Sequence, residues 1–185
     1  MKPEESRIYS YKDYVQWEGR WELINGIPHN MSPAPTWDHQ FAVGELYFAL
    51  RSYFGNKDCF VAVAPFDVRF AEDDDYENTK DVVQPDISVI CNKNQLTKSG
   101  CLGAPTLVVE VLSPSTALKD RNEKFKKYQQ FGVPEYWIVD PNYKIIEVYG
   151  LEDGYFRKNE AYGQKQEVKS FIFPDLEIEI DKVFN

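Results

Sequence analysis

The sequence lacks any apolar run of about 18 residues, which is the length that a membrane-spanning helix needs. It also lacks a basic N-terminal stretch followed by an apolar one, so we expect neither a membrane span nor a signal peptide. Cysteine is scarce, because the chain has three and no two of them form a CxxC pair. We therefore expect a cytoplasmic protein that keeps Cys59, Cys91 and Cys101 as reduced thiols and uses none of them to bind zinc.

Positive charge is also in short supply. The chain has 21 lysines and arginines against 30 acidic residues, which leaves a net charge of −9. Proteins that grip nucleic acid through its phosphates usually present a basic face. The local exception is the stretch 119–128, in which half of the positions are basic: Lys119, Arg121, Lys124, Lys126 and Lys127. We expect Lys119 and Lys126 to be solvated charges on a helix.

Apolar residues, by contrast, are plentiful enough for one sizeable core. They make up 43% of the 185 residues, and aromatic residues make up 15%, which argues against disorder and favours a single domain over residues 1–185. The longest helical pattern runs from Thr36 to Phe54, and a second one lies between Thr116 and Gly132. Short β-branched or alternating stretches lie between and after these helices, so the sequence predicts an α/β fold.

One glutamate interrupts the most apolar strand pattern. In residues 107–112, Glu110 is flanked by valine on both sides. Because neighbouring residues point to opposite faces, this run predicts a central strand covered on both faces. A buried carboxylate is costly unless a metal, a cation or a proton accompanies it. The alternative is an acid near the strand end that reaches solvent or pairs with one arginine.

A lysine lies on the apolar face of the helix that follows. At about 100° per residue, Lys124 falls between Tyr128 and Phe131, whereas Glu123 and Lys126 point to the other side. Lys124 is therefore predicted to face inward, unless its long side chain reaches water from the edge of that face.

Three further side chains are candidates by position. Asp86 follows Pro85 at the start of a strand pattern, although a Pro-Asp pair is more often a turn than a site. Glu22 precedes the hairpin signal Asn25-Gly26, and its place in the alternation lets it point into a site or to solvent. His39 lies on the apolar stripe of the long helix, near its start. A core role is the default for His39, and a site role stays open.

Several segments form one pattern along nearly the whole chain. They are ELING (22–26), Pro33 followed by His39, QPD (84–86), GAPTLVVEVLSPST (103–116), then Asp120, Lys124, Tyr128 and Gly132-Val133 at four-residue steps, and EYWIVDP (135–141). This pattern resembles the Uma2 family (DUF820), a bacterial family abundant in cyanobacteria. The resemblance implies a fold like that of the PD-(D/E)xK restriction endonucleases, with a mixed central β-sheet flanked by α-helices.

The resemblance also implies a reaction. It is hydrolysis of the phosphodiester bonds of nucleic acid, DNA above all, by an endonuclease in which Asp86 and Glu110 hold Mg²⁺ or Mn²⁺. The lysine of the nuclease superfamily normally lies two residues after the second acid, where this chain has Leu112. In the Uma2 pattern the lysine has moved to the next helix, and Lys124 matches it.

Other positions of the pattern complete the expected site. Glu22 matches the N-terminal glutamate of the family and is expected to be a further catalytic acid. His39 and Tyr128 are supporting candidates.

Two other interpretations stay open. The fold could serve without activity as a binding or dimerisation module, which the acidic composition favours. Alternatively, Asp86 and Glu110 could act as an acid/base pair on a substrate other than nucleic acid. Neither explains why a lysine should face the same interior as both carboxylates. Members of the superfamily often work as dimers, so we also expect a homodimer.

Overall fold

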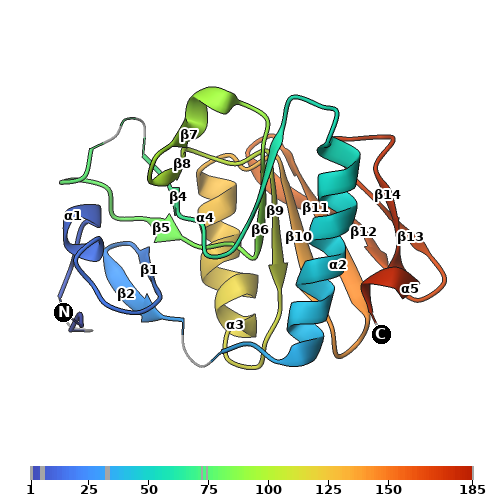
Figure 1. The fold of residues 1–185 in the computed structure, drawn as a ribbon, viewed down its shortest axis with the longest axis horizontal. Coiled ribbons are helices and arrows are strands. Elements are labelled where there is room, and N and C mark those ends of the chain that lie inside the picture. The colour runs from blue at the N-terminus through green and yellow to red at the C-terminus, as the bar shows by residue number, and fades with distance from the viewer. Residues whose placement is uncertain (1, 5–6, 32–33, 72, 74, 185) are drawn as a thin grey trace.

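A mixed sheet in the middle of the molecule organises the fold (Figure 1). The computed structural model describes residues 2–4, 7–31, 34–71, 73 and 75–184, so Pro33 of the family pattern lies outside the described residues. The strands of the central sheet lie in the order β12-β11-β10-β9-β6-β3. In that order their bounds are Tyr155–Tyr162, Ile145–Glu152, Glu135–Asp140, Leu107–Val111, Ile87–Ile90 and Phe60–Val63.

Strand pairing follows the apolar pattern of the sequence. β9 and β10 run parallel, whereas the other neighbouring strands of this sheet pair antiparallel. Every residue of β9 is buried, Glu110 included, as expected for a strand that is apolar on both faces. β10 and β11 form an antiparallel hairpin, with Trp137 opposite Val148.

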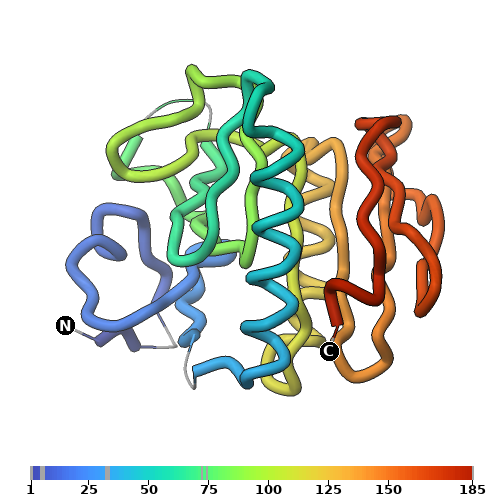
Figure 2. Tube along the Cα trace, turned by 45° about the vertical axis from the view of Figure 1, so that its right-hand side comes forward, coloured from blue at the N-terminus to red at the C-terminus, as the bar shows by residue number. Residues whose placement is uncertain are grey.

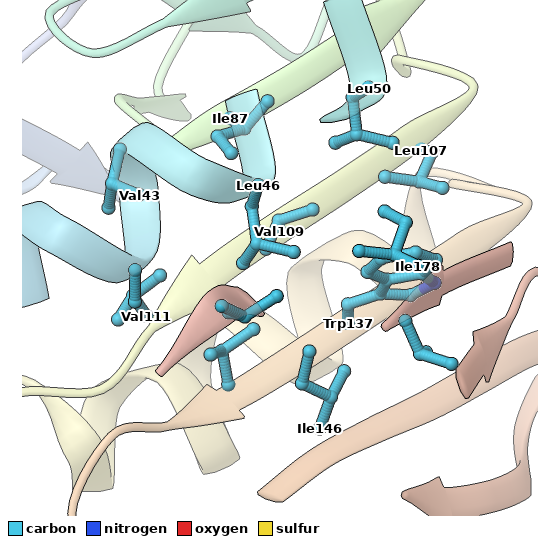
Figure 3. Packing of buried hydrophobic residues seen from close by; sticks show 14 of the residues in the cluster. Val43, Leu46, Leu50, Ile87, Leu107, Val109, Val111, Trp137, Ile146 and Ile178 are labelled. Atoms are coloured by element: carbon cyan, nitrogen blue, oxygen red, sulfur yellow. The ribbon is translucent and has the colours of Figure 1, made fainter. Parts of the chain in front are cut away.

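One face of the central sheet is covered by α2 (Trp37–Phe54), the long helix that the sequence predicts. Its Leu46 packs with Val109 of β9 and Trp137 of β10 in one core cluster (Figure 3). His39 is on the same buried stripe and is 6% exposed. The start of α2 therefore places a histidine beside the end of β9.

The opposite face is covered by a second helical segment. It consists of α3 (Ala117–Lys119), a π-helical turn η2 (Asp120–Lys124) and α4 (Phe125–Gln130). Tyr128 of this segment packs with Val108 and Tyr136 of the sheet. Helices thus cover both faces, and the expected mixed sheet flanked by helices is confirmed.

A second sheet, which the sequence did not indicate, lies beside the first. Its strands lie in the order β2-β1-β5-β4-β8-β7, with bounds Ile27–Asn30, Trp21–Ile24, Val82–Val83, Val68–Arg69, Gly100–Leu102 and Leu96–Thr97. The predicted β1–β2 hairpin is confirmed, because Asn25 and Gly26 have φ of 54° and 76°, the left-handed values of a type I′ turn. With α1 (Tyr11–Tyr14), this sheet lies on the opposite side of α2 from the C-terminal strands (Figure 2).

The remaining elements are short. They are η1 (Lys93–Gln95), the antiparallel pair β13 (Glu167–Lys169) and β14 (Glu177–Glu179), and α5 (Ile180–Val183). Within the described ranges, no helix combines the length and the apolar character that crossing a bilayer demands.

The cysteines depart from the sequence prediction. Cys59 and Cys91 form a disulfide, so the expectation of three reduced thiols is wrong for this pair. The reason is strand pairing: β3 and β6 are antiparallel with Phe60 opposite Ile90, which places the two flanking cysteines side by side although 32 residues separate them. Cys101 is a buried free thiol, and burial raises its pKa to about 12.

A buried glutamate at the start of β10 anchors the C-terminal part of the chain. Glu135 accepts hydrogen bonds from Nε1 of Trp137 (2.6 Å), Oγ of Ser170 (2.7 Å), and the backbone N–H groups of Phe171 (2.9 Å) and Ile172 (3.1 Å). Its side chain is fully buried, the bonds from Trp137 and Ser170 are buried, and those from the two backbone N–H groups are partly buried. Glu135 therefore has a structural role and not a role in a site.

Glu135→Ala is expected to lower the free energy of unfolding by about 3 kcal/mol or more, because it leaves several buried donors without an acceptor. Urea unfolding followed by tryptophan fluorescence measures this loss. Glu152→Ala is the matched control, because the side chain of Glu152 is exposed and, among the described residues, its ion pair is with the exposed Arg157. Equal unfolding midpoints for both variants would show that Glu135 does not anchor the segment 170–172.

Candidate active site

A pocket of about 350 Å³ opens where the carboxyl end of β9 meets the starts of α2 and α3 and the β1–β2 hairpin. Four of the predicted site residues line it: His39, Asp86, Glu110 and Lys124. The segment after β9 continues the wall through Ser113 to Thr116. The structure therefore brings together side chains that are far apart in the sequence.

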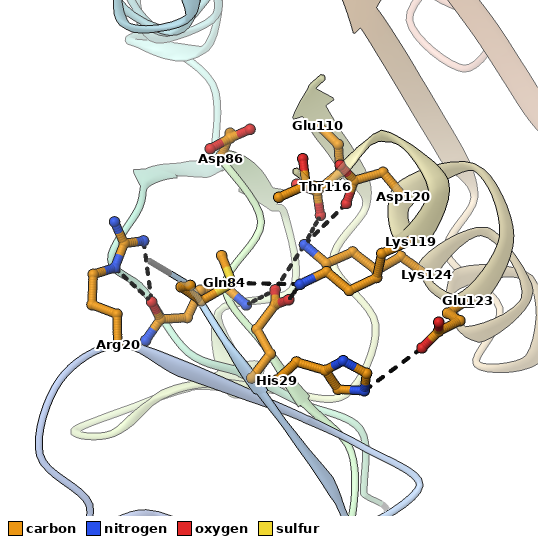
Figure 4. A network of polar contacts seen from close by, with 12 residues as sticks. Arg20, His29, Gln84, Asp86, Glu110, Thr116, Lys119, Asp120, Glu123 and Lys124 are labelled. Carbon is orange, nitrogen blue, oxygen red and sulfur yellow. Dashed lines mark hydrogen bonds and ion pairs between the residues drawn. The ribbon is translucent and has the colours of Figure 1, made fainter. Parts of the chain in front are cut away.

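Lys124 is the centre of the polar network beside this pocket (Figure 4). Its Nζ lies 2.7 Å from Oε1 of Glu22, 2.8 Å from Oε1 of Glu110 and 3.5 Å from Oδ1 of Asp120, and its side chain is 1% exposed. Burial lowers the pKa of Lys124, but the charges of Glu110, Glu22 and Asp120 outweigh it and raise the pKa well above its ordinary value. The predicted inward orientation of Lys124 is confirmed, and the ammonium stays charged.

Glu22 reaches the same network from the hairpin. It is fully buried, so of its two predicted orientations the structure selects the inward one. Lys119 donates to its Oε2 at 2.8 Å, and the backbone N–H of Gln84 donates to its Oε1 at 3.0 Å. Burial would raise the pKa of Glu22, but Lys124 and Lys119 outweigh burial and lower the pKa to about 2. Glu22 is thus an ionised carboxylate held by two lysines.

Glu110 has the opposite electrostatic character. Its Oε1 accepts from Nζ of Lys124 at 2.8 Å and from the hydroxyl of Tyr128 at 2.5 Å. Burial is the main cause that raises its pKa to about 8. The charges of Asp120, Asp86 and Glu22 add to burial, and Lys124 opposes them. Tyr128, one of the supporting candidates, therefore contacts the network through Glu110.

Asp86 and His39 form the other side of the site. The backbone N–H of Val111 donates to Oδ2 of Asp86 at 2.8 Å, and Nε2 of His39 lies 3.3 Å from the same oxygen. Burial would lower the pKa of His39, but its hydrogen bond to Asp86 and the charge of that carboxylate raise it. Nδ1 of His39 is buried and has no hydrogen-bond partner among the described residues. His39 thus contacts Asp86 directly, so the default core role is incomplete.

Asp120 is a member of the network that sequence reasoning missed as a site residue. It is 1% exposed, and within the described part of the chain its Oδ1 has no hydrogen-bond partner. Burial is the main cause of its raised pKa, with the charges of Glu22 and Asp86 adding to it. A signal was available, because a spacing of four residues puts Asp120 on the same helix face as Lys124.

The expectation for Lys119 is wrong. Its side chain is only 12% exposed, because it lies over the hairpin and pairs with Glu22, whereas Lys126 is exposed as predicted. A helical wheel gives the direction of a side chain but not which distant segment packs there. Gln84, which belongs to the QPD motif, likewise gains its role from a contact with the hairpin, because its backbone N–H donates to Glu22.

The charges of the network do not balance. Four carboxylates face two ammonium groups, and with all of them ionised and His39 neutral the net charge is −2. Burial makes such an imbalance costly. The carboxylates are those of Glu22, Asp86, Glu110 and Asp120, and the ammonium groups are those of Lys119 and Lys124; all are buried except Asp86 and Lys119, whose side chains are 20% and 12% exposed. The cluster therefore favours uptake of protons or of one divalent cation.

The donor atoms fit a hard cation. Mg²⁺ prefers oxygen ligands and keeps several waters, so it is often bound through one or two protein carboxylates. Asp86, Glu110 and Asp120 all line the pocket, and among the described residues Oδ1 of Asp120 has no hydrogen-bond partner, although it lies 3.5 Å from Nζ of Lys124. Over the described residues, no group of three or more His, Cys, Asp or Glu side chains is arranged to hold a metal ion. An ion at this place would rely on two carboxylates together with water or substrate.

Comparison with known proteins agrees with this fold. Residues 11–181 match the Uma2 family, described as "Putative restriction endonuclease". A protein of Synechocystis sp. (strain PCC 6803), "Uncharacterized protein slr1290", is 28% identical over 149 residues, which cover 78% of this chain and 75% of the relative. The crystal structure of "a putative nuclease belonging to DUF820" from Anabaena variabilis has a TM-score of 0.74 at 18% identity, covering 94% of this chain and 96% of that one. The likeness to this structure shows a shared nuclease-like fold. Because the family model matches residues 11–181, which are most of the chain, the chain belongs to the Uma2 family.

Proposed function

We propose that this protein is a metal-dependent endonuclease that hydrolyses phosphodiester bonds of nucleic acid, with DNA as the expected substrate. The observation that carries the proposal is the burial of Lys124 among Glu22, Glu110 and Asp120 beside an open pocket. Well-packed apolar residues usually stabilise a core as well as or better than a buried ion cluster does. A chemical function explains why the cluster is there, whereas stability alone does not.

Asp86 and Glu110 would hold Mg²⁺ or Mn²⁺ in this site. Bound there, the metal would supply a Lewis acid for the phosphate and a water of lowered pKa. Asp86 is oriented for this task by the backbone N–H of Val111 and by His39, which both contact its Oδ2. Glu110 is oriented in the same way by Lys124 and Tyr128. His39 and Tyr128 are therefore positioning residues in this proposal.

Lys124 would act on the phosphate and on the acids at once. An ammonium group has three N–H donors, and Glu22 and Glu110 lie at hydrogen-bonding distance from it. The third contact, 3.5 Å to Asp120, is too long for a hydrogen bond. The third N–H donor of Lys124 is therefore available to orient the attacking water or to offset the charge that builds on the phosphate. Glu22 holds the lysine in place, and Lys119 in turn holds Glu22.

Nicking of supercoiled plasmid with Mg²⁺ or Mn²⁺ tests the proposal. We expect metal-dependent nicking by the wild type and its loss in Asp86→Ala and in Lys124→Ala. The matched control is Lys126→Ala, because Lys126 lies on the same helical segment with an exposed side chain. Labelled single strands are assayed in parallel, so that the choice of substrate does not hide activity.

The outcomes separate the three interpretations. Activity that persists in a chelator would contradict the proposal and favour an acid/base hydrolase. An inert wild type that also fails to bind Mg²⁺ or Mn²⁺ in calorimetry would favour a binding or dimerisation module. Nicking that survives in Asp86→Ala would place the reaction elsewhere on the molecule.

The expected partners belong to the same proposal. A net charge of −9 gives the chain little long-range attraction for nucleic acid, so local contacts must supply the affinity. The homodimer implied by the family resemblance stays a prediction. α2 offers one surface for it, since Trp37 and Phe48 are each 70% exposed and Phe41 is 37% exposed on its outer side.

A further inference from the structure

A second pocket, of about 240 Å³, is lined by α1 and the turn that leads into β1. Its lining consists of Tyr14, Val15, Trp17, Gly19, Trp21 and Asp67. It is smaller than the roughly 300 Å³ at which pockets for drug-sized ligands begin. Its size therefore suits one ring system, and none of its side chains has a role in the chemistry proposed above.

Among the aromatic walls of this pocket, Tyr14 already stacks on Tyr11 at an interplanar angle of 27°, whereas Trp17 has no parallel ring partner among the described residues. Trp17 contacts Tyr9, Tyr14 and Trp21 with interplanar angles of 89°, 60° and 72°, so none of these three rings stacks flat on it. The ring of Trp21 is fixed by its Nε1, which donates to the backbone oxygen of Glu18 at 2.9 Å. A flat heteroaromatic ring would add the stacked contact, and any base can do so because every base has a π-face.

A carboxylate stands at the edge of the same pocket. Oδ1 of Asp67 accepts from the hydroxyl of Tyr14 at 3.0 Å and from Nε2 of Gln84 at 2.9 Å. These bonds fix the carboxylate, whose negative charge repels phosphate and favours a ligand with N–H donors. An exocyclic amino group on a stacked base is such a donor.

Gln84 joins this pocket to the candidate active site. Its side chain bonds to Asp67, while its backbone N–H donates to Glu22. Its Oε1 accepts from Nε and Nη2 of Arg20, both at 3.2 Å, and Arg20 itself lines the larger pocket. Arg20 thus lies between the two pockets. Its guanidinium is hydrogen-bonded to a neutral amide, so its positive charge can bind a phosphate.

We propose that this second pocket binds one unpaired nucleobase adjacent to the phosphodiester bond at the candidate active site. The base stacks on Trp17, its amino group donates to Asp67, and its phosphate meets Arg20. Because a base inside a duplex is already stacked on both sides, the substrate is single-stranded or locally unwound nucleic acid. This inference rests on the proposed nuclease function, which it deepens by naming the class of substrate.

Binding without cleavage tests the inference. Anisotropy of fluorescein-labelled six-nucleotide DNA single strands is measured with EDTA present. We expect Trp17→Ala to weaken binding about 5- to 150-fold, the range reported by alanine substitution at one stacked base. Trp17→Phe, which keeps a ring, is expected to weaken it much less. Tyr143→Ala is the control, because Tyr143 is an exposed aromatic residue that lines neither pocket.

Asp67 is tested by comparing two bases of equal ring size. Cytosine carries an amino group where thymine carries a carbonyl oxygen. We expect six-nucleotide cytidine strands to bind about tenfold tighter than thymidine strands, because one hydrogen bond to a charged group increases affinity by about this factor. Asp67→Asn is expected to remove the difference, since it keeps the oxygen that Tyr14 and Gln84 contact.

Three results would overturn the inference: no binding of single strands by the wild type, equal affinity of wild type and Trp17→Ala, or equal affinity for cytidine and thymidine strands. A duplex of the same length that competes as well as a single strand would also contradict it. Because these experiments involve no turnover, the base pocket can stand when nicking fails. Conversely, metal-dependent nicking with unchanged binding in Trp17→Ala would support the nuclease and reject the base pocket.

Discussion

Lys124→Met is expected to lower the free energy of unfolding by about 3–5 kcal/mol, the usual cost of removing one partner from a buried ion pair. The variant leaves Glu22, Glu110 and Asp120 buried around an uncharged side chain. Lys119 would then be the one lysine ion-paired with these acids in the described part of the chain, and its contact is with Glu22. We expect metal-dependent nicking to fall by about 100- to 1,000-fold, as on loss of one electrostatic contact to a transition state.

Stability and activity can be separated by a second change. In Lys124→Met with Glu22→Gln, one buried charge is removed along with its partner, so part of the lost stability should return while activity stays low. Urea unfolding and plasmid nicking measure the two effects on the same preparations. Lys126→Met is the control. If Lys126→Met lowers the free energy of unfolding as much as Lys124→Met does, the loss in Lys124→Met does not come from the buried charge cluster.

The inward direction of Lys124 was accessible from the sequence because it depends on local geometry. Residues 124–131 are close in sequence, and the helical period alone fixes which side chains share a face. The π-helical turn at 120–124 did not change that result, since Lys124 remains on the buried side. The apolar run around Glu110 predicted a doubly covered strand for the same reason, and β9 is one.

What the sequence left open depends on long-range packing. An alternating strand assigns Glu22 to a face but does not say which face is buried. That is decided when the β1–β2 hairpin packs against the α3–η2 segment and Lys119 bridges the two. The misjudged solvation of Lys119 and the unexpected Cys59–Cys91 disulfide have the same origin. Each depends on a partner that no local pattern identifies.

The electrostatics of the network could not be predicted from the sequence either. Glu22 and Glu110 are the same residue type and contact the same ammonium group, yet the pKa of Glu22 is lowered to about 2 and that of Glu110 is raised to about 8. The difference comes from the neighbours, because Glu22 has two lysines whereas Glu110 shares one lysine and lies near further acids. Titratable groups whose pKa values are pushed apart in this way are typical of functional sites.

This separation of pKa values predicts that metal affinity depends strongly on pH. The pKa of Glu110 is raised to about 8, so below that pH a metal ion bound there as proposed would have to displace the proton of Glu110. We expect the affinity for Mg²⁺ to fall about tenfold for each pH unit below 8 and to level off above 8. At pH 7, binding should release about one proton per metal ion, which calorimetric titrations in two buffers of different ionisation enthalpy measure.

The metal-free protein should show the complementary effect on stability. A carboxyl group with a raised pKa binds its proton more tightly in the folded state, so its contribution falls as pH rises from the ordinary 4.5 towards 8. Glu22, with a lowered pKa, contributes stability above 4.5 and loses it as pH falls towards 2. Glu110→Gln should remove the dependence of stability on pH between 4.5 and 8 and keep the dependence between 2 and 4.5. It should also abolish the pH dependence of metal binding, together with most of the affinity for the metal. If wild-type affinity for Mg²⁺ is the same at pH 6 and pH 8, Glu110 is not the ligand that exchanges its proton for the metal.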